Sequence, residues 1–575
     1  MRIEQMLVAM LLSLAVATLS CAPPQPAPQA SAPVAEQPKP AALKRIVGAI
    51  RGDPLTLSDS INWAASGSTV AGVDVLEQLL HAGLLLVDGE GELQPLLAEA
   101  VPTVENGLWK VFPDGRMETT WKLKPNLQWH DGHPLTTEDF LFSATVVQDR
   151  EVPIRQDQAF RFVEAIQAPD SQTLLVTWKS LYIDADKLFT QASSMRNLPM
   201  PKHLLESAYL DDRPGITQSP YFGSEYVGAG PFRLKEWAFG SHLTVQANER
   251  YVLGRPKLDE ITVKFILDTN TMVANLLAGA LDLTLGRQAV NEEQAITVRD
   301  QWKDGVVHAP LENTTGLYPQ FLNPDPPLAS DARFRRALLH ALDRQQIVDT
   351  FLAGLVPVAH SIISPDDPDY KQVEARVVRY AYDPRRALEL LDGLGLTKGA
   401  DGAYRDAANR PLSIEVRTRA NPLREKLQQV IADDWRRVGV IVDAAVVPEQ
   451  RIRDRAYQAE HPGFYFRAGP PTQFPEWVSG ETPTAENNYV GVSPIRYRNP
   501  AYDALIERFL STIPRAERMW ILGDIVHHAT DQLLILPVFH ESVPSLVSNR
   551  LVNIAGRRGI SIQAWNAHQW DVKGG

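Results

Sequence analysis

The sequence predicts a soluble α/β protein that contains several core-sized units. Strand-like and helix-like segments alternate along most of the chain, which is typical of layered α/β folds. The chain has 575 residues, and at roughly 150 residues per domain this length predicts three or four units. Hydrophobic residues make up 44% of the chain and charged residues 22%, as in an ordinary globular protein.

The charge balance and the cysteine count disfavour two classes of site. Asp and Glu number 69 against 57 Lys and Arg, which leaves a net charge of -12. A nucleic-acid surface would need a basic stripe to neutralise phosphates, so we expect no nucleic-acid partner. Cys21 is the single cysteine. An intrachain disulfide and a cysteine-based metal cluster are therefore impossible, and we expect no cofactor.

The first 20 residues are typical of an export signal. The apolar run over residues 6–19 is shorter than the roughly 20 residues that span a bilayer, and it suits the central part of a signal peptide. Ser20-Cys21 closes this run and resembles the end of a bacterial lipoprotein signal, although Thr18 occupies the usual leucine position. We therefore expect cleavage after residue 20 and a lipid on Cys21. An ordinary signal peptide, with Cys21 incidental, is the alternative.

Residues 21–43 are expected to form a tether. They consist mainly of Ala, Pro and Gln, a composition that cannot build a core and favours an extended chain. A tether after an export signal suits a folded body that works beside a membrane. The expected location is the periplasm or cell envelope, with the protein held at the membrane by its N-terminal lipid.

The folded body is predicted to begin near Leu43. Residues 44–50 favour a buried strand, and residues 73–86 carry apolar side chains at helical spacing. Further along the chain, Trp121 and Leu123 alternate with polar residues, which predicts another strand.

Residues 130–134 (His-Asp-Gly-His-Pro) predict a turn that leads into a helix. Thr136 or Thr137 is placed to cap this helix, and Glu138 and Asp139 fall in its first turn, where acidic side chains are favourable. The two histidines could suggest a metal site. The Gly-Pro turn between them favours local turn chemistry instead, so no metal site is expected.

This stretch resembles the signature of family 5 of the extracellular solute-binding proteins, Leu-Arg-x-Gly-x-x-Trp-His-Asp-Gly-x-Pro-x-Thr-Ala-Glu-Asp-Val. The Trp-His-Asp-Gly core is intact at residues 129–132, and the chain departs from the signature at Pro125-Asn126, Thr137 and Phe140. Other segments resemble motifs of the same family in the expected order. They are residues 93–99, 200–204, 228–232, 248–251, 254–261, 334–344 and 382–391.

The resemblance implies a periplasmic-binding-protein-like fold (class II, large cluster C type). In that fold two α/β lobes enclose a hinged cleft, and an extra α/β domain is added to the first lobe. By this analogy residues 44–74, 225–305 and 540–575 form lobe I, residues 75–224 form the extra domain II, and residues 306–539 form lobe III.

The resemblance also implies a function, that of the substrate-binding protein of an ABC importer. Such a protein captures peptides or related solutes by closing a hinge, and it carries out no chemistry. The sequence shows no phosphate-binding glycine loop and no His-Glu-x-x-His motif, so we expect no enzyme. The expected partners are the solute and the permease and ATPase subunits, with the binding protein itself a monomer.

Residues 464–478 are expected to line the cleft. Their sequence, Phe-Tyr-Phe-Arg-Ala-Gly-Pro-Pro-Thr-Gln-Phe-Pro-Glu-Trp-Val, resembles the cleft segment Arg-Ala-Gly-Trp-x-Ala-Asp-Tyr-x-x-Pro of oligopeptide-binding members. The match places Gln473 where those members carry an Asp that pairs with the peptide's α-ammonium, and Phe474 at the aromatic position. A buried ammonium that faces an amide lacks a counter-charge, so Glu476 is the candidate substitute.

Arg467 and Trp477 complete the expected ligand-binding residues. Arg467 can pair bidentately with a ligand carboxylate, or with an acid of the second lobe. Trp477 can stack on a sugar or an apolar group, or belong to the core. The alternative for the whole loop is that it is rebuilt and that none of its side chains touches ligand.

Three functions are compatible with the sequence. Peptide uptake is the family default. Gln473 raises a second possibility, the uptake of a non-peptide solute such as an oligosaccharide or an opine-like compound. A tethered sensor or chaperone-like protein would use the same fold without an importer.

Overall fold

The computed structural model describes residues 43–66, 70–191, 197–554, 556 and 564–574. Residues 1–42 lie outside this range, and with them the expected signal peptide, Cys21 and all of the expected tether except Leu43. Leu43–Gly575 form one structural unit, whose parts are described below.

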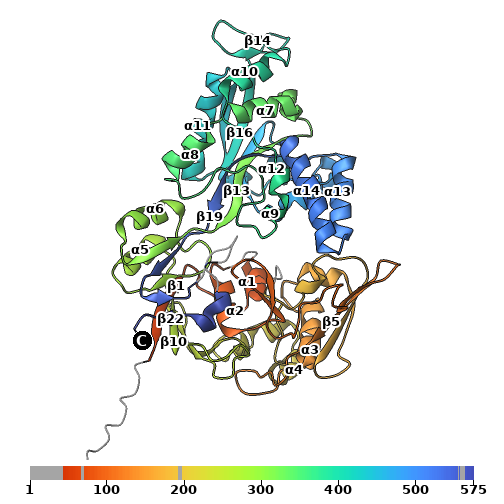
Figure 1. Cartoon of the computed structure of the whole chain (residues 1–575), viewed down its shortest axis with the longest axis vertical. Helices are drawn as coiled ribbons and strands as arrows, with labels where there is room; N and C mark the ends of the chain where they lie inside the picture. The colour runs from red at the N-terminus through yellow and green to blue at the C-terminus, as the bar shows by residue number, and fades with distance from the viewer. Residues whose placement is uncertain (1–42, 67–69, 192–196, 555, 557–563, 575) are drawn as a thin grey trace, which may run out of the picture. The chain divides into compact units, whose positions relative to one another are not determined.

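A mixed seven-stranded sheet gathers strands from distant parts of the chain (Figure 1). In the order of their hydrogen bonding, the strands are β12 (Gly305–His308), β20 (Ser545–Ser548), β11 (Leu283–Thr284), β1 (Arg45–Ile50), β10 (Glu260–Phe265), β9 (His242–Ala247) and β8 (Phe232–Ala238). β1 runs parallel to β10 and β11, whereas β8, β9 and β10 are successively antiparallel. The strand predicted at residues 44–50 is confirmed as β1, in which Ile46 and Ile50 are buried.

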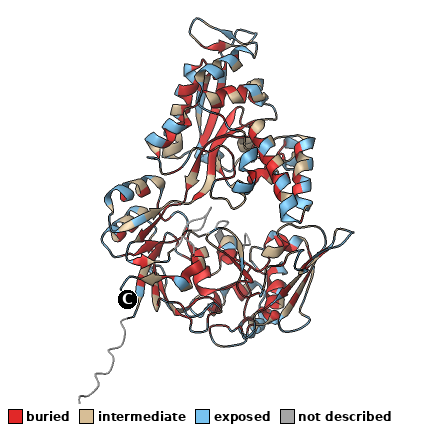
Figure 2. Cartoon of the chain, viewed as in Figure 1, coloured by how far each residue is buried: buried red, intermediate tan, exposed pale blue. Residues whose placement is uncertain are grey.

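A five-stranded sheet carries Arg467, one of the five residues expected to bind ligand. Its strands, in order, are β17 (Ile441–Val447), β16 (Ser413–Arg419), β18 (Phe464–Gly469), β13 (Leu311–Pro319) and β19 (Leu536–Ser542). β16 is parallel to β17 and β18, and β13 is antiparallel to β18 and β19. Figure 2 shows that buried residues run along the strands of both large sheets.

A four-stranded antiparallel sheet and three strand pairs make up the other β-structure of the described residues. The four-stranded sheet has the order β4 (Trp109–Val111), β5 (Met117–Lys122), β7 (Thr173–Trp178), β6 (Val163–Gln167). The predicted strand around Trp121 is thus confirmed as β5. The strand pairs are β2 (Leu85–Val87) with β3 (Leu93–Pro95), β14 (Thr397–Lys398) with β15 (Tyr404–Arg405), and β21 (Leu551–Val552) with β22 (Asp571–Val572).

Helices cover these sheets, and within the described part of the chain each falls short of the length and apolar character that a membrane span needs. The α-helices are α1 (Asp59–Ser66), α2 (Val73–Leu80), α3 (Thr137–Gln148), α4 (Lys202–Asp211), α5 (Thr269–Leu277), α6 (Glu292–Gln301), α7 (Ala332–His340), α8 (Arg344–Phe351), α9 (Tyr370–Val373), α10 (Pro384–Asp392), α11 (Pro422–Arg437), α12 (Arg455–Ala459), α13 (Pro500–Ser511) and α14 (Arg515–Asp531).

The helix predicted over residues 73–86 is shorter than expected. α2 ends at Leu80, and Leu85–Val87 form strand β2 instead. The chain leaves the helix at His81, whose backbone is extended, and the Leu84 amide then donates a 2.9 Å hydrogen bond to the Phe189 carbonyl. This pairing with a distant segment overrides the helical spacing of the apolar side chains, so the prediction was wrong beyond Leu80.

The predicted turn and helix cap at residues 130–139 are confirmed. Gly132 has φ +93°, a left-handed conformation that glycine adopts without strain. The Trp129 amide donates to the His133 carbonyl at 2.8 Å and closes the turn. α3 then begins after Thr136, whose amide donates to the Asp139 carboxylate at 2.9 Å.

His130 of this turn has a structural role. Its Nδ1 accepts a 3.1 Å hydrogen bond from the Gly228 amide, and its Nε2 donates to the Gly230 carbonyl at 3.1 Å. Burial lowers the pKa of His130 to about 3, so the ring is neutral. The histidine thereby fixes the signature turn to the segment that precedes β8.

Two short connections join the seven-stranded and five-stranded sheets. One leads from β12 to β13 through residues 309–310, and the other leads from β19 to β20 through residues 543–544. The connections lie side by side, because the Val543 amide donates a 2.9 Å hydrogen bond to the Pro310 carbonyl. Two adjacent connections of this kind are suited to a hinge.

The expected domain boundaries can be compared with these elements. The boundary at 74/75 falls inside α2, the boundary at 305/306 falls inside β12, and the boundary at 539/540 falls inside β19. A boundary inside a helix or strand is unusual, because boundaries normally lie in exposed linkers. The division of residues 44–575 into two lobes and an extra domain stays a prediction.

Candidate ligand-binding pocket

Strand β18 positions Arg467 by the alternation of its side chains. Successive side chains point to opposite faces of a strand. Phe464 and Phe466 are fully buried on one face, where the Phe464 ring packs edge-on against Trp435 at 5.6 Å. Tyr465 and Arg467 therefore share the other face, and Arg467 keeps partial access to solvent.

Three of the five residues predicted to bind ligand meet around Tyr318 of β13. The guanidinium of Arg467 lies over the Tyr318 ring, 5.3 Å from its centre. The Tyr318 hydroxyl donates a 3.2 Å hydrogen bond to Oε1 of Gln473. The side chains of Gln473 and Arg467 both lie close enough to Glu476 to lower the pKa of its carboxyl. Gln473 itself is only 3% exposed.

The pKa of Glu476 shows how this group is balanced. Burial raises the pKa of the carboxyl above its usual value, while the hydrogen bond from Gln473 and the charge of Arg467 act in the opposite direction. Burial is the largest of these effects, so the carboxyl of Glu476 lies in a partly desolvated place.

Phe474 and Trp477, the other two predicted residues, pack into the core. Both lie in the short 3-10 helix η8 (Pro471–Trp477). The Phe474 ring meets Phe509 of α13 edge-on at 5.3 Å, and its carbonyl accepts a 2.9 Å hydrogen bond from the Tyr502 hydroxyl. Trp477 is fully buried in the same hydrophobic cluster. Of the two interpretations that the sequence left open for Trp477, the structure places it in the core.

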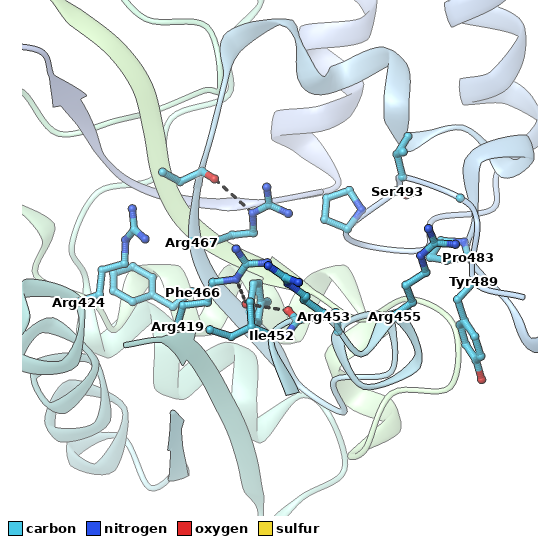
Figure 3. A pocket seen from close by; sticks show the side chains of 17 residues that line it. Arg419, Arg424, Ile452, Arg453, Arg455, Phe466, Arg467, Pro483, Tyr489 and Ser493 are labelled. Carbon is cyan, nitrogen blue, oxygen red and sulfur yellow. Dashed lines mark hydrogen bonds between the residues drawn. The ribbon is translucent and has the colours of Figure 1, made fainter. Parts of the chain in front are cut away.

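A cavity of about 350 Å³ lies beside β18, and five arginines line it (Figure 3). They are Arg419, Arg424, Arg453, Arg455 and Arg467. Arg467 is the one among the five predicted residues that belongs to this lining. In the view of Figure 3, Arg424 and Arg455 lie on opposite sides and the other three lie between them.

Uncharged residues complete the wall. Tyr465 and Phe466 come from β18, Ile452 precedes α12, and Tyr489 comes from the loop that follows η8 along the chain. The Tyr465 hydroxyl donates to Oε1 of Gln458 at 3.0 Å, which orders the floor. Within the described part of the chain, no Asp or Glu lines this cavity.

Four of the five arginines were missed from the sequence. Arg419 ends β16 and Arg424 lies in the first turn of α11, so the fold alone brings them to β18. Arg453 and Arg455 belong to the alternating stretch Arg-Ile-Arg-Asp-Arg at residues 451–455. That cluster of charge was the available signal, but charge runs are more often solvated surface than binding sites.

One end of the pocket reaches toward the seven-stranded sheet. Arg424 pairs with Glu541 of β19 at 2.9 Å, and Glu541 also accepts a 2.5 Å hydrogen bond from the Thr315 hydroxyl. Glu292, the first residue of α6, lies close enough for the charges of Glu541 and Arg424 to act on its carboxyl, whose pKa burial raises. α6 packs on β12, so the Arg424 end of the pocket lies near an element that packs on the seven-stranded sheet.

Comparisons with known proteins agree with this architecture. The oligopeptide-binding protein AppA of Bacillus subtilis is 26% identical over 407 residues, which cover 70% of this chain and 68% of AppA. A putative ABC transporter peptide-binding protein of Brucella ovis is 24% identical over 292 residues, which is 50% of this chain and 51% of that protein. The structure of the oligopeptide-binding protein from Thermus thermophilus in complex with a pentapeptide superposes with a TM-score of 0.62 and 23% identity, over 92% of this chain and 96% of that chain.

The family assignment rests on more than these pairwise matches. The family model described as bacterial extracellular solute-binding proteins, family 5 middle, matches residues 92–486. The solved structure adds the α/β fold of the periplasmic binding proteins. The chain therefore belongs to family 5 of the bacterial extracellular solute-binding proteins.

Proposed function

We propose that this chain is the substrate-binding protein of an ABC importer, which captures a peptide or related solute and delivers it to a permease and its ATPase. The observation that carries the proposal is the family match over residues 92–486. The relative AppA is an oligopeptide-binding protein, which supports peptides as the default solute.

The proposed solute site is the arginine-lined cavity beside β18. Arg467 is proposed to contact a carboxylate of the solute, because its guanidinium has an open fork and bonds only the neighbouring Ala468 carbonyl, at 3.2 Å, among the described residues. Gln473 and Glu476 are proposed to hold Tyr318 and Arg467 in place from behind. Phe474 and Trp477 are proposed to support η8 from the core.

Capture is proposed to work by closing the hinge at residues 309–310 and 543–544. A solute in the cavity would contact the five-stranded sheet. On closure, α6 would approach Arg424, and the part of the protein that contains the seven-stranded sheet would then cover the solute. Solute contacts to both parts of the protein make the solute bind the closed state more tightly than the open state. This difference in affinity is all that the mechanism requires. No bond in the solute is made or broken.

The location follows from the expected N-terminus. We propose that the mature protein begins at Cys21, carries lipid there, and works as a monomer in the periplasm or cell envelope. The family's extracellular character supports export.

Ligand recovery and hinge closure test the function together. Mass spectrometry of solute extracted from natively purified protein should identify a peptide or peptide-like molecule. The same solute, added back at about 100 times its Kd, should stabilise the fold by about 2.7 kcal/mol, and X-ray scattering should show a smaller radius of gyration. A solute that the purified protein chemically alters would overturn the proposal.

A non-peptide solute is the second candidate, and the pocket itself favours it. A free peptide carries an α-ammonium that needs an acidic partner once buried. The charged residues that line the cavity are arginines, which repel an ammonium, and the described lining contains no acid; Glu476 is not part of it. A solute without an amine would avoid this mismatch.

A further inference from the structure

The protein around the cavity balances only part of its positive charge. Five guanidinium groups line about 350 Å³, and the described part of the lining contains no carboxylate. Guanidinium is charged at every physiological pH, so the positive charge cannot be removed by losing protons.

The partners of each arginine show how much charge stays free. Arg424 is paired, through Glu541 at 2.9 Å. Among the described residues, the Arg419 side chain donates only to the uncharged Tyr465 hydroxyl, at 3.3 Å. Arg467 donates to a backbone carbonyl and stacks on Tyr318, with Glu476 acting on it from behind.

The side chains of Arg453 and Arg455 have no hydrogen bond or ion pair with any other residue that the structure describes. The carboxylate between them, Asp454, is occupied elsewhere. It pairs with Arg451 at 2.9 Å and accepts the Tyr457 amide at 3.0 Å, which caps α12. Asp454 therefore caps α12 and pairs with Arg451, and it does not neutralise the two arginines at the cavity.

The arginines of such a cluster repel one another, and a bound anion would relieve this repulsion. Like charges that share a concave site repel one another and focus a positive field into it. Planar guanidinium forks match the oxygens of carboxylates and phosphates, which they bind bidentately. A single carboxylate can engage only part of a set that extends from Arg424 to Arg455 across the pocket.

The size and the uncharged walls limit the solute further. About 350 Å³ lies near the lower end of the roughly 300–1,000 Å³ range of small-molecule sites. Ile452 and Tyr489 offer apolar surface to a short carbon frame between the charged groups.

We infer that this pocket selects compact solutes that carry two or more carboxylate or phosphate groups, with Arg419, Arg453, Arg455 and Arg467 as the anion-binding residues. The inference rests on the proposed function, since it names the solute class of the same site. Acidic short peptides and amine-free polycarboxylates share the required chemistry, and the test separates them.

Titration calorimetry of the mature chain with four probes tests the inference: citrate and the tripeptides Glu-Ala-Glu, Ala-Ala-Ala and Lys-Ala-Lys. At about 20 mM salt, citrate or Glu-Ala-Glu should bind at least about tenfold more tightly than Ala-Ala-Ala, and Lys-Ala-Lys most weakly. The preference should shrink at about 500 mM salt, where charges are screened. This comparison needs no variant.

The double variant Arg453→Gln/Arg455→Gln assigns the effect to the pocket. It should lose about tenfold or more in affinity for the anionic probe and stay within about twofold for the neutral tripeptide. Arg436→Gln is the matched control. It removes one positive charge from α11, where Arg436 pairs with Asp433 on the exposed surface, and it should change neither affinity. Melting curves check that each variant is folded, and single Arg455→Gln is the fallback.

The outcomes separate the two proposals. Equal binding of neutral and anionic tripeptides, unchanged in the double variant, overturns the anion selectivity and leaves peptide capture intact. Binding of citrate without any tripeptide supports the selectivity and removes peptides as the cargo. No binding of either anionic probe overturns the inference.

Discussion

The hydroxyl of Tyr318 donates a 3.2 Å hydrogen bond to Oε1 of Gln473 and so joins strand β13 to the helix η8. Gly469 makes this approach possible, because a Cβ at that position would lie 2.2 Å from both the Tyr318 hydroxyl oxygen and Gln473 Oε1. Gln473 also hydrogen-bonds Glu476. One neutral amide thus connects a phenol and an acid behind the arginine-lined cavity.

The first prediction concerns Gln473→Asp. The substitution places a second buried carboxylate beside Glu476, whose own pKa burial already raises. We expect the free energy of unfolding to fall by about 1–3 kcal/mol at pH 7. A carboxyl with a raised pKa is tolerated when protonated and destabilises as pH rises through that pKa, so the deficit should shrink toward pH 4. Thermal melts across this range measure it.

Gln473→Asn is the matched control for this prediction, because it keeps a neutral amide. If Gln473→Asp does not lower the stability, direct contact of Gln473 with the ligand is favoured, as the family resemblance predicted. In that case Gln473→Asp would keep its stability and bind peptides with free N-termini about ten- to a hundredfold more tightly than the wild type.

The second prediction concerns Arg335 of α7, which is 2% exposed. Its guanidinium donates to the carbonyls of Ala329 at 2.9 Å, Gln532 at 2.6 Å and Leu533 at 3.1 Å. Burial lowers its pKa to about 10, so it stays charged at neutral pH. Arg335→Met leaves these carbonyls unpaired and should cost about 3–5 kcal/mol in urea unfolding.

The adjacent arginine provides the control for that experiment. Arg336 pairs with Asp531 at 2.9 Å, and the two side chains are 31% and 38% exposed. Arg336→Met should cost less than about 1 kcal/mol. Equal losses in the two variants would contradict a structural role specific to Arg335.

Local signals in the sequence predicted local structure well. Alternation around Trp121 predicted β5, and residues 44–50 predicted β1. The turn with Gly132 and the cap at Thr136 depend on residues within a few positions of each other, so a single sequence carries them. The helix over residues 73–86 failed where a distant partner, Phe189, takes the backbone amide of Leu84.

The binding site was harder to predict because it is assembled from segments far apart. The resemblance of residues 464–478 to a family cleft segment predicted that Gln473 and Trp477 bind ligand, but both are buried in the fold. Arg419, Arg424 and Arg453 reach the cavity only through the parallel pairing of β16 with β18 and the placement of the chain before α12. Apart from the charge run at residues 451–455, which contains Arg453, nothing in their local sequence distinguishes them from surface arginines, so their convergence is a property of the fold.

The third prediction concerns Cys21, which lies outside the described residues. Cells that express the wild type should hold the protein in the membrane fraction, with a mature N-terminus at Cys21. More than one acyl chain is expected, because a single chain anchors only marginally. Cys21→Ala should move the protein to the soluble fraction or block its processing. Thr18→Leu, which restores the usual leucine, should leave membrane association intact. A soluble wild-type protein cleaved beyond residue 21 would contradict the anchor.

The last prediction uses Asp186, in the short 3-10 helix Ala185–Lys187. Its Oδ1 is buried and has no hydrogen-bond partner among the described residues. Burial raises the pKa of this carboxyl from 3.8 to about 6, against the opposing charge of Lys187. Because the folded pKa lies above the unfolded one, its contribution to stability is complete below about pH 3.8 and is lost as pH rises through about 6.

Asp186→Asn should therefore stabilise the protein at high pH. A shift of this size corresponds to about 3 kcal/mol, and since the residue keeps some contact with water we expect about 1–2 kcal/mol at pH 8. The gain should decline through pH 6 and vanish near pH 4. Urea unfolding at several pH values measures it. Asp300→Asn removes the same charge from a side chain that is 65% exposed, and it should leave the profile unchanged. A gain that is independent of pH, or larger at pH 5 than at pH 8, would show that folding does not raise the pKa of Asp186.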